Sequence, residues 1–204
     1  MYYFNFTDHT TNLHDYYKFN EPLSSNIIDK IIQLTEGIKY EEGKTQADLN
    51  LHNSEKQTND PRRSLIKWVE YDVDSKGLYD ILYECIMAAN QSRWNFDLLF
   101  SPESLQYTEY RSSNKGHYDW HQDLLGEFFY RKLSLVIQLS DPKEYEGGEL
   151  KITGYSPENN PIYTIPKQKG SVVIFPSYLY HRVTPVTKGI RKSLVWWVGG
   201  TPFK

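Results

Sequence analysis

Two histidines and two aspartates fall within seven positions of the segment "HYDWHQDLL", residues 117–125. The triplet His-x-Asp occurs in it twice, at His117/Asp119 and at His121/Asp123. Imidazole and carboxylate groups are common ligands of divalent metal ions. Because alternate residues of a strand share a face, we expect residues 117, 119, 121 and 123 to project to the same side, so either pair could supply two ligands.

A third ligand must come from elsewhere in the chain. His9, His14 and His52 lie in the polar N-terminal part, whereas His181 lies in "FPSYLYHRVTPV" between two strand-like runs. His181 is therefore the best candidate. Two histidines and one carboxylate leave three positions of a metal ion open, which is typical of non-haem Fe(II) sites.

Arg191 follows His181 by ten residues and opens the strand-like run "RKSLVWWVGG". Alternation places Arg191, Ser193, Val195 and Trp197 on one face of that strand. An arginine that points into an apolar interior is costly unless an anion meets it. An internal salt bridge would satisfy it; so would a carboxylate ligand such as the far end of a dicarboxylic keto acid, held by Arg191 and Ser193.

These residues need strands to position them, and the rest of the sequence provides strands after two helices. Helical spacing of apolar residues predicts helices over 24–37 and 75–94, with a strand at 63–73 and a polar loop at 41–61. After residue 95 the period changes to short strands separated by Gly, Pro, Asn and Ser. The predicted strands are 96–100, 105–111, 117–123, 132–140, 148–155, 161–166, 171–177, 181–186 and 191–200. This pattern predicts a barrel or sandwich with the helices covering one face.

Composition excludes several classes of protein. The 204 residues carry a net charge of −3 with a sequence pI near 6.1, which argues against nucleic acid as the main partner. No signal sequence and no apolar stretch of membrane-spanning length appears. The single cysteine, Cys85, fits a reducing compartment. We expect a cytoplasmic protein; its many Asn, Lys, Ile and Tyr residues hint at a bacterial or viral source and, if viral, at the host cytoplasm.

The motifs "YRSSNKGHYDWHQD", "LSLVIQLSDPKEYEGGELKI" and "GSVVIFPSYLYHRVTPVTKGIRKSLVWW" together resemble the Fe(II)/2-oxoglutarate dioxygenases. Within them the chain is most similar to the prolyl 4-hydroxylase branch, including the PKHD-type hydroxylases, over about residues 105–200. The resemblance implies a mainly β fold, a double-stranded β-helix (jelly-roll, cupin-like) with N-terminal α-helices packed on the major sheet. Residues 95–204 would form this core, and residues 1–94 an N-terminal support region of helices and strands in the same domain.

The resemblance also implies which residues serve the site. In the family pattern, tyrosines and a glycine turn precede the ligands as Tyr110, Gly116 and Tyr118 do here. It implies His121, Asp123 and His181 as the metal ligands and leaves His117 and Asp119 in the approach segment.

Other matching positions concern the cosubstrate and the substrate. Tyr110 and Arg191, with Ser193, would bind the cosubstrate, and Gln138 stands where some relatives have a second cosubstrate tyrosine. Tyr118, Trp197 and Lys132 would lie at the substrate edge. Implied cofactors are Fe(II), 2-oxoglutarate and O2, with ascorbate as a further candidate.

The implied activity is hydroxylation of a C–H bond, coupled to decarboxylation of 2-oxoglutarate to succinate and CO2. The favoured substrate is a prolyl residue of a protein or peptide, as in a peptidyl-proline 4-dioxygenase. Two alternatives stay open: a dioxygenase of a free amino acid or other small molecule, and a non-catalytic β-sandwich that uses the same His/Asp/His set to bind a metal such as zinc. No nucleic acid or membrane partner is expected.

Overall fold

The computed structural model describes residues 16–45, 61–101, 103–124, 128–154 and 156–201. Most of the predicted loop at 41–61 lies outside these ranges, as do His9, His14 and His52.

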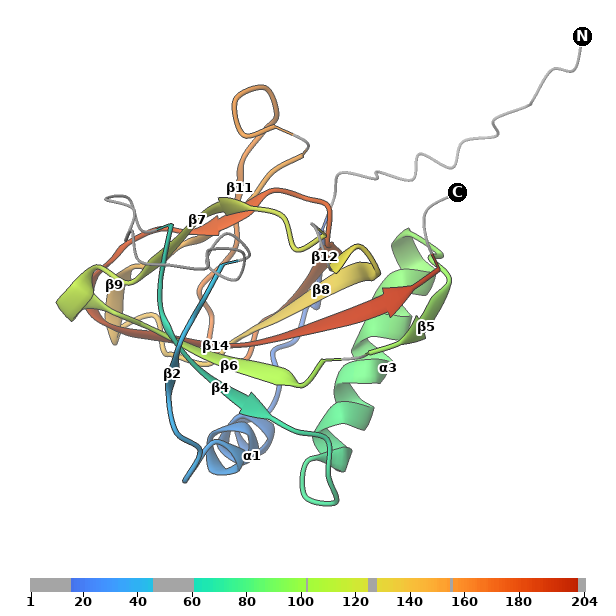
Figure 1. Ribbon diagram of the computed structural model, residues 1–204, viewed down its shortest axis with the longest axis horizontal. Coiled ribbons are helices and arrows are strands. Elements are labelled where there is room, and N and C mark those ends of the chain that lie inside the picture. Colours follow the sequence, from blue (N-terminus) through green and yellow to red (C-terminus); the bar gives the residue numbers. More distant parts are fainter. Residues whose placement is uncertain (1–15, 46–60, 102, 125–127, 155, 202–204) are drawn as a thin grey trace, which may run out of the picture.

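Two α-helices lie on one side of the larger of two sheets (Figure 1). They are α1 (Ser25–Leu34) and α3 (Lys76–Arg93), each within three residues of its predicted ends. Their apolar stripes share one core cluster with the sheet, in which Ile31 and Leu82 are fully buried beside Leu135. Burial of each such side chain stabilises the fold by roughly 1.5–3 kcal/mol. Among the described residues, neither helix has the length and apolar character of a membrane span.

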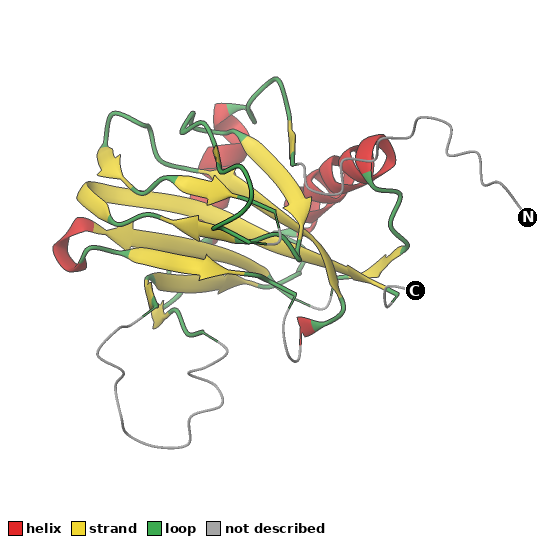
Figure 2. Cartoon of the chain, turned by 90° about the horizontal axis from the view of Figure 1, so that it is seen from above, coloured by secondary structure: helices red, strands yellow, loops and turns green. Residues whose placement is uncertain are grey.

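The described strands form two sheets in which all neighbours are antiparallel, and Figure 2 shows them from above. The larger sheet has the order β1 (Tyr17–Lys18), β12 (Val172–Pro176), β8 (Arg131–Gln138), β14 (Val186–Gly200), β6 (Leu105–Arg111), β4 (Leu65–Val69) and β2 (Glu41–Glu42), and β5 (Leu98–Phe100) and β9 (Tyr145–Gly147) also pair with β14. The smaller sheet has the order β11 (Tyr163–Thr164), β10 (Leu150–Ile152), β13 (His181–Val183), β7 (His117–His121) and β3 (Arg62–Arg63). The predicted mainly β architecture with two helices is therefore confirmed.

Strand alternation places a second core between the two sheets. On β14, Leu194 and Trp196 belong to the cluster on the helix side, whereas Val195 packs against the cluster on the other side. That second cluster includes Phe175 and Leu150, one from each sheet. The larger sheet is thus covered on both faces, by helices on one and by the smaller sheet on the other.

A tight turn joins β6 to β7 through the short 3-10 helix η1 (Ser112–Asn114). A Cβ atom on Gly116 would lie 2.6 Å from the backbone nitrogen of Arg111, so only glycine fits this approach. The turn carries the chain from the larger sheet into the smaller one, and it therefore faces Tyr110 of β6 toward the residues of β7.

The structure adds short strands to those expected, and it contradicts one expected alternation. The short strands β1, β2 and β9 were not predicted, and β1 to β4 show that the first 94 residues contribute strands to both sheets. The alternation expected for 117–123 also fails, because β7 ends at His121 and its register against β13 shifts between His181 and Val183. A shift of this kind breaks the period of two.

Candidate active site

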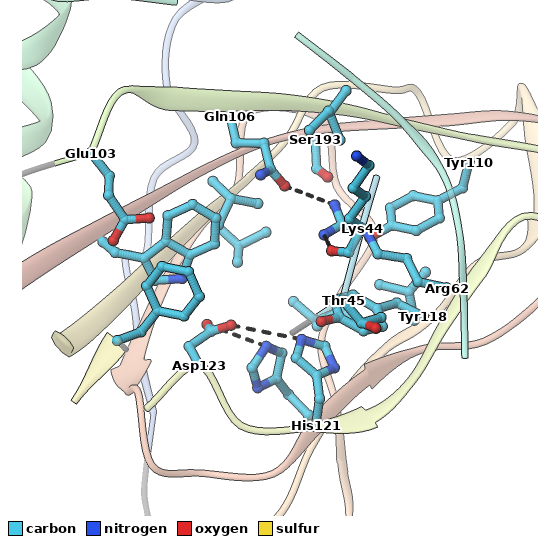
Figure 3. Close-up of a pocket in the computed structure, with 18 of the residues that line it drawn as sticks. Lys44, Thr45, Arg62, Glu103, Gln106, Tyr110, Tyr118, His121, Asp123 and Ser193 are labelled. Carbon is cyan, nitrogen blue, oxygen red and sulfur yellow. Dashed lines mark hydrogen bonds and ion pairs between the residues drawn. The ribbon is translucent and has the colours of Figure 1, made fainter. Parts of the chain in front are cut away.

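A cavity of about 740 Å³ lies between the two sheets (Figure 3). Arg191, Ser193 and Trp197 of β14 line one wall, and His121 and His181 of the smaller sheet line the opposite wall. The predicted residues Tyr110, Tyr118 and Asp123 line the same cavity. His117 and Asp119 do not, so the structure brings only the second His-x-Asp pair to it.

The two histidines are neighbours because β7 and β13 pair directly at His121 and His181. Asp123 follows β7 by two residues and is tethered there by its backbone N–H, which donates to the carbonyl of Ser177 at 2.9 Å. The Asp123 carboxylate lies 3.7 Å from His121 Nε2 and 3.4 Å from His181 Nε2. All three ligand atoms fall within 4.8 Å of one another, a spacing that one metal ion could bridge.

Backbone carbonyls orient both imidazoles. His121 Nδ1 lies 2.7 Å from the carbonyl oxygen of Asp119, and His181 Nδ1 lies 3.1 Å from that of Leu179. Because a carbonyl can only accept, each Nδ1 carries the proton and each Nε2 presents a lone pair toward Asp123. This is the tautomer that a metal ligand requires.

The environment also sets the charges of the ligands. Burial would raise the pKa of Asp123, but the two imidazoles and a hydrogen bond from Ser134 Oγ at 2.6 Å outweigh it and lower the pKa. The pKa of His121 is lowered well below its usual value, chiefly by burial and then by His181. An ionised aspartate and a neutral histidine are the forms that bind metal, so the donor set fits a divalent cation.

Arg191 lies across the cavity with little solvent exposure, 2%. Its guanidinium donates to Ser193 Oγ at 3.2 Å and lies 5.4 Å from the centre of the Tyr110 ring. Among the described residues, no carboxylate forms an ion pair with it. Burial lowers the pKa of Arg191, and a buried cation with only neutral neighbours is a ready site for a carboxylate.

Two predicted residues do not line the cavity. Gln138 lines a second, smaller void of about 10 Å³ beside Arg191, where its amide nitrogen donates to the Tyr145 hydroxyl at 2.9 Å. Lys132 is 2% exposed on β8 and is likewise absent from the cavity wall.

Sequence reasoning missed one feature of the cavity, an ion pair at the edge nearest Trp197. Arg131 Nε donates to Glu103 at 2.6 Å, and its guanidinium lies 4.0 Å from the Trp197 ring and 3.9 Å from the Phe128 ring. Arg131 precedes Lys132, which was expected at the substrate edge, but Glu103 had no signal, because it precedes β6 in an irregular turn.

The side chains of Tyr118 and Arg62 stack beside His121, one of the candidate metal ligands. The Tyr118 ring lies parallel to the His121 ring with 3.4 Å between centroids, and the Arg62 guanidinium covers Tyr118 at 4.7 Å. Burial raises the pKa of Tyr118 to about 12, so its hydroxyl stays protonated. The stack restricts rotation of His121 from the side away from Asp123.

Solved structures share this fold at low sequence identity. A prolyl hydroxylase from Trichoplax adhaerens, solved with a hypoxia inducible factor peptide fragment, aligns with a TM-score of 0.70 at 18% identity, covering 91% of this chain and 83% of that one. A Pseudomonas putida prolyl-4-hydroxylase aligns with a TM-score of 0.65 at 18% identity, covering 92% and 94%. These likenesses support the jelly-roll arrangement of the two sheets.

Sequence comparison gives closer relatives over part of the chain. A PKHD-type hydroxylase of Crocosphaera subtropica is 38% identical over 120 residues, 55% of this chain and 51% of that protein. One of Gloeothece citriformis is 44% identical over 84 residues, 40% of this chain and 36% of that protein. The chain thus spans about half or less of these relatives. Residues 105–199, which carry both walls of the cavity, match the 2OG-Fe(II) oxygenase superfamily.

Proposed function

We propose that this protein is an Fe(II)- and 2-oxoglutarate-dependent hydroxylase of a prolyl residue in a protein or peptide. The observation that carries the proposal is that the His121/Asp123/His181 cluster and the buried guanidinium of Arg191 face each other across one cavity. A keto acid with a second carboxylate is the kind of molecule that could engage both at once.

Each wall has a separate task in this proposal. His121, Asp123 and His181 hold Fe(II), and Arg191 with Ser193 binds the far carboxylate of 2-oxoglutarate while Tyr110 borders its path. Bound Fe(II) with 2-oxoglutarate and O2 supplies oxidation of a C–H bond, coupled to decarboxylation to succinate and CO2. The apolar side chains of Val136 and Leu150, which also line the cavity, keep water away from this path.

The substrate would enter beside Trp197. The Trp197 and Phe128 rings flank the Arg131 guanidinium, and Glu103 fixes that guanidinium by an ion pair. Such a wall offers aromatic faces to a pyrrolidine ring and N–H donors to a nearby carbonyl or hydroxyl. Support for proline comes from the names of the relatives, several of which are prolyl hydroxylases.

A free amino acid or another charged small molecule is the second candidate. Charged side chains line the cavity besides the residues assigned above, among them Glu41, Lys44 and Arg62. Such groups would recognise the ammonium and carboxylate of a free amino acid. Use of ascorbate, a cytoplasmic location and the division at residue 95 stay predictions from the sequence.

The test is oxygen-dependent turnover with two classes of substrate. Purified protein with Fe(II) and 2-oxoglutarate is incubated with a proline-containing peptide library or with free amino acids, and succinate and hydroxylated product are measured by mass spectrometry. Succinate formation coupled to hydroxylation of a peptidyl proline supports the proposal. Hydroxylation of free amino acids alone would support the second candidate, and metal binding without 2-oxoglutarate binding would reject both.

A further inference from the structure

Next to Arg191, around a small void that adjoins the cavity, lies a small polar cluster that the proposed function does not use. It consists of Gln138 on β8 and Tyr145 on β9, which are 6% and 3% exposed. Gln138 Nε2 donates to the Tyr145 hydroxyl at 2.9 Å, and both side chains line one small void together with Arg191. The three side chains thus form one connected group, and Arg191 is its member at the proposed cosubstrate site.

The backbone of β9 brings Tyr145 to this place. β9 pairs with the first part of β14, with Tyr145 opposite Gly189, two residues before Arg191. A Cβ atom on Gly148 would lie 3.0 Å from Arg191 Cδ and 3.3 Å from the Tyr145 ring, so the arginine and the tyrosine both pack over this glycine. Lys167 covers the Tyr145 ring at 4.9 Å and donates to the Gly147 carbonyl at 2.6 Å. The ring is therefore held from several sides.

Neutral side chains such as these can hold a cationic side chain in place without neutralising its charge. A carboxylate beside Arg191 would fix the guanidinium, but it would also neutralise the charge that attracts an incoming carboxylate. A phenol oxygen accepts a hydrogen bond and adds no charge at neutral pH, and the Gln138 amide limits the directions in which that oxygen can turn. The cluster can thus restrain Arg191 and leave its charge for a ligand.

We propose that Tyr145, oriented by Gln138, is a positioning residue that holds the Arg191 guanidinium in place for the distal carboxylate of the cosubstrate. The inference rests on the proposed function and deepens it. It assigns to Gln138 an indirect task, in place of the direct contact expected from the sequence, and it brings in Tyr145, which no sequence pattern pointed to.

The test compares two keto acids on the Fe(II)-loaded protein without oxygen. 2-Oxoglutarate has the distal carboxylate and 2-oxobutyrate lacks it, whereas the keto-acid group is the same in both. Dissociation constants are measured by isothermal titration calorimetry for wild type and for Tyr145→Phe, which removes only the hydroxyl. Tyr163→Phe serves as the matched control, because Tyr163 is 42% exposed on β11 and does not line the cavity.

We expect Tyr145→Phe to weaken 2-oxoglutarate binding about tenfold, the size of one lost hydrogen bond to a charged group, and to leave 2-oxobutyrate binding unchanged. Gln138→Leu should weaken 2-oxoglutarate binding less than Tyr145→Phe does. A variant with both substitutions should bind 2-oxoglutarate no more weakly than Tyr145→Phe alone, because both substitutions act on Arg191 through the Tyr145 hydroxyl.

Two results would overturn the inference. Unchanged affinity for 2-oxoglutarate in Tyr145→Phe would show that the hydroxyl does not support Arg191. An equal loss for both keto acids would show a general effect on the fold. Failure of the wild type itself to bind 2-oxoglutarate would instead reject the proposed function, so the two failures are distinguishable.

Discussion

Arg191 and Arg111 lie at adjacent positions of one strand pair and face opposite sides of the larger sheet. In the register of β14 and β6, Ile190 is opposite Arg111 and Arg191 is opposite Tyr110. Arg111 donates through two nitrogens to Glu109, at 3.0 and 2.7 Å, on the side of the helices. Arg191 faces the cavity, where its described partners are neutral.

We call the residues around Glu109, on the helix side of the sheet, the outer cluster. In it the charges of Glu109 and Arg111 meet each other, whereas Arg191, on the cavity side, has no charged partner among the described residues. Glu109 also accepts hydrogen bonds from the Tyr40 hydroxyl at 2.5 Å and the Tyr107 hydroxyl at 3.0 Å, so a 4% exposed carboxylate meets three donor groups. Such a closed network contributes to stability. Arg191 keeps an uncompensated charge, which costs stability and serves binding. On β7, His121 likewise lines the cavity, whereas His117 does not.

The largest effect is expected at the proposed metal ligands on the cavity side. His121→Ala would remove one of the three proposed ligands, so we expect Fe(II) binding to fall below detection and turnover to drop by roughly a thousandfold or more. Metal content after dialysis and succinate formation check this.

His117→Ala is the matched control, four residues away on the same strand, and should keep both metal and turnover. If His117→Ala lost the metal and His121→Ala kept it, the ligand pair would be the upstream one and the cavity would not be the metal site.

The two arginines should respond in opposite ways when each is replaced by leucine. Arg191→Leu should weaken 2-oxoglutarate binding about a hundredfold, the size of a lost bidentate ion pair, with a free energy of unfolding equal to or above wild type. Arg111→Leu should leave binding unchanged and lower the free energy of unfolding by about 1–3 kcal/mol, because the buried Glu109 loses a charged partner.

Calorimetric titration with 2-oxoglutarate and urea unfolding of the ligand-free protein measure the two quantities. The comparison fails if Arg191→Leu destabilises the protein more than Arg111→Leu does, since Arg191 would then be part of a closed network.

The two helices and the cavity-facing side chains of β14 could be predicted from the sequence. Helical spacing located α1 and α3, and the alternation of β14 placed Arg191, Ser193 and Trp197 on the cavity side. These features depend on the local periodicity of apolar residues, and that periodicity can be read directly from the sequence.

Features that depend on tertiary contacts were not predictable in this way. The register shift beside β7 depends on pairing with β13, so alternation alone put Asp123 in a strand that ends at His121. Glu103 reaches Arg131 across 28 residues of sequence, and Tyr145 reaches Arg191 from a three-residue strand. Short strands and single long-range ion pairs leave no periodic signal.

The smallest effect, a change in acid stability, is expected in the outer cluster. Burial would raise the pKa of Glu109, but hydrogen bonds from Tyr40, Arg111 and Tyr107 outweigh it and lower the pKa below its usual value. A group whose pKa is lower in the folded state adds stability above its unfolded pKa and loses that contribution as the pH falls through the folded pKa. Wild type should therefore lose stability below about pH 4–5, the range of an unfolded glutamate.

Glu109→Gln removes this titration and keeps the shape of the side chain. We expect the variant to be about 1–2 kcal/mol less stable than wild type near pH 7, with a difference that shrinks as the pH is lowered toward 3. Urea unfolding at several pH values measures both curves, and 2-oxoglutarate binding at pH 7 should stay unchanged. Because Tyr110 lies between Glu109 and Arg111 on β6, a parallel loss of binding would mean that the outer cluster also positions the cavity wall, and the division between the two faces would not hold.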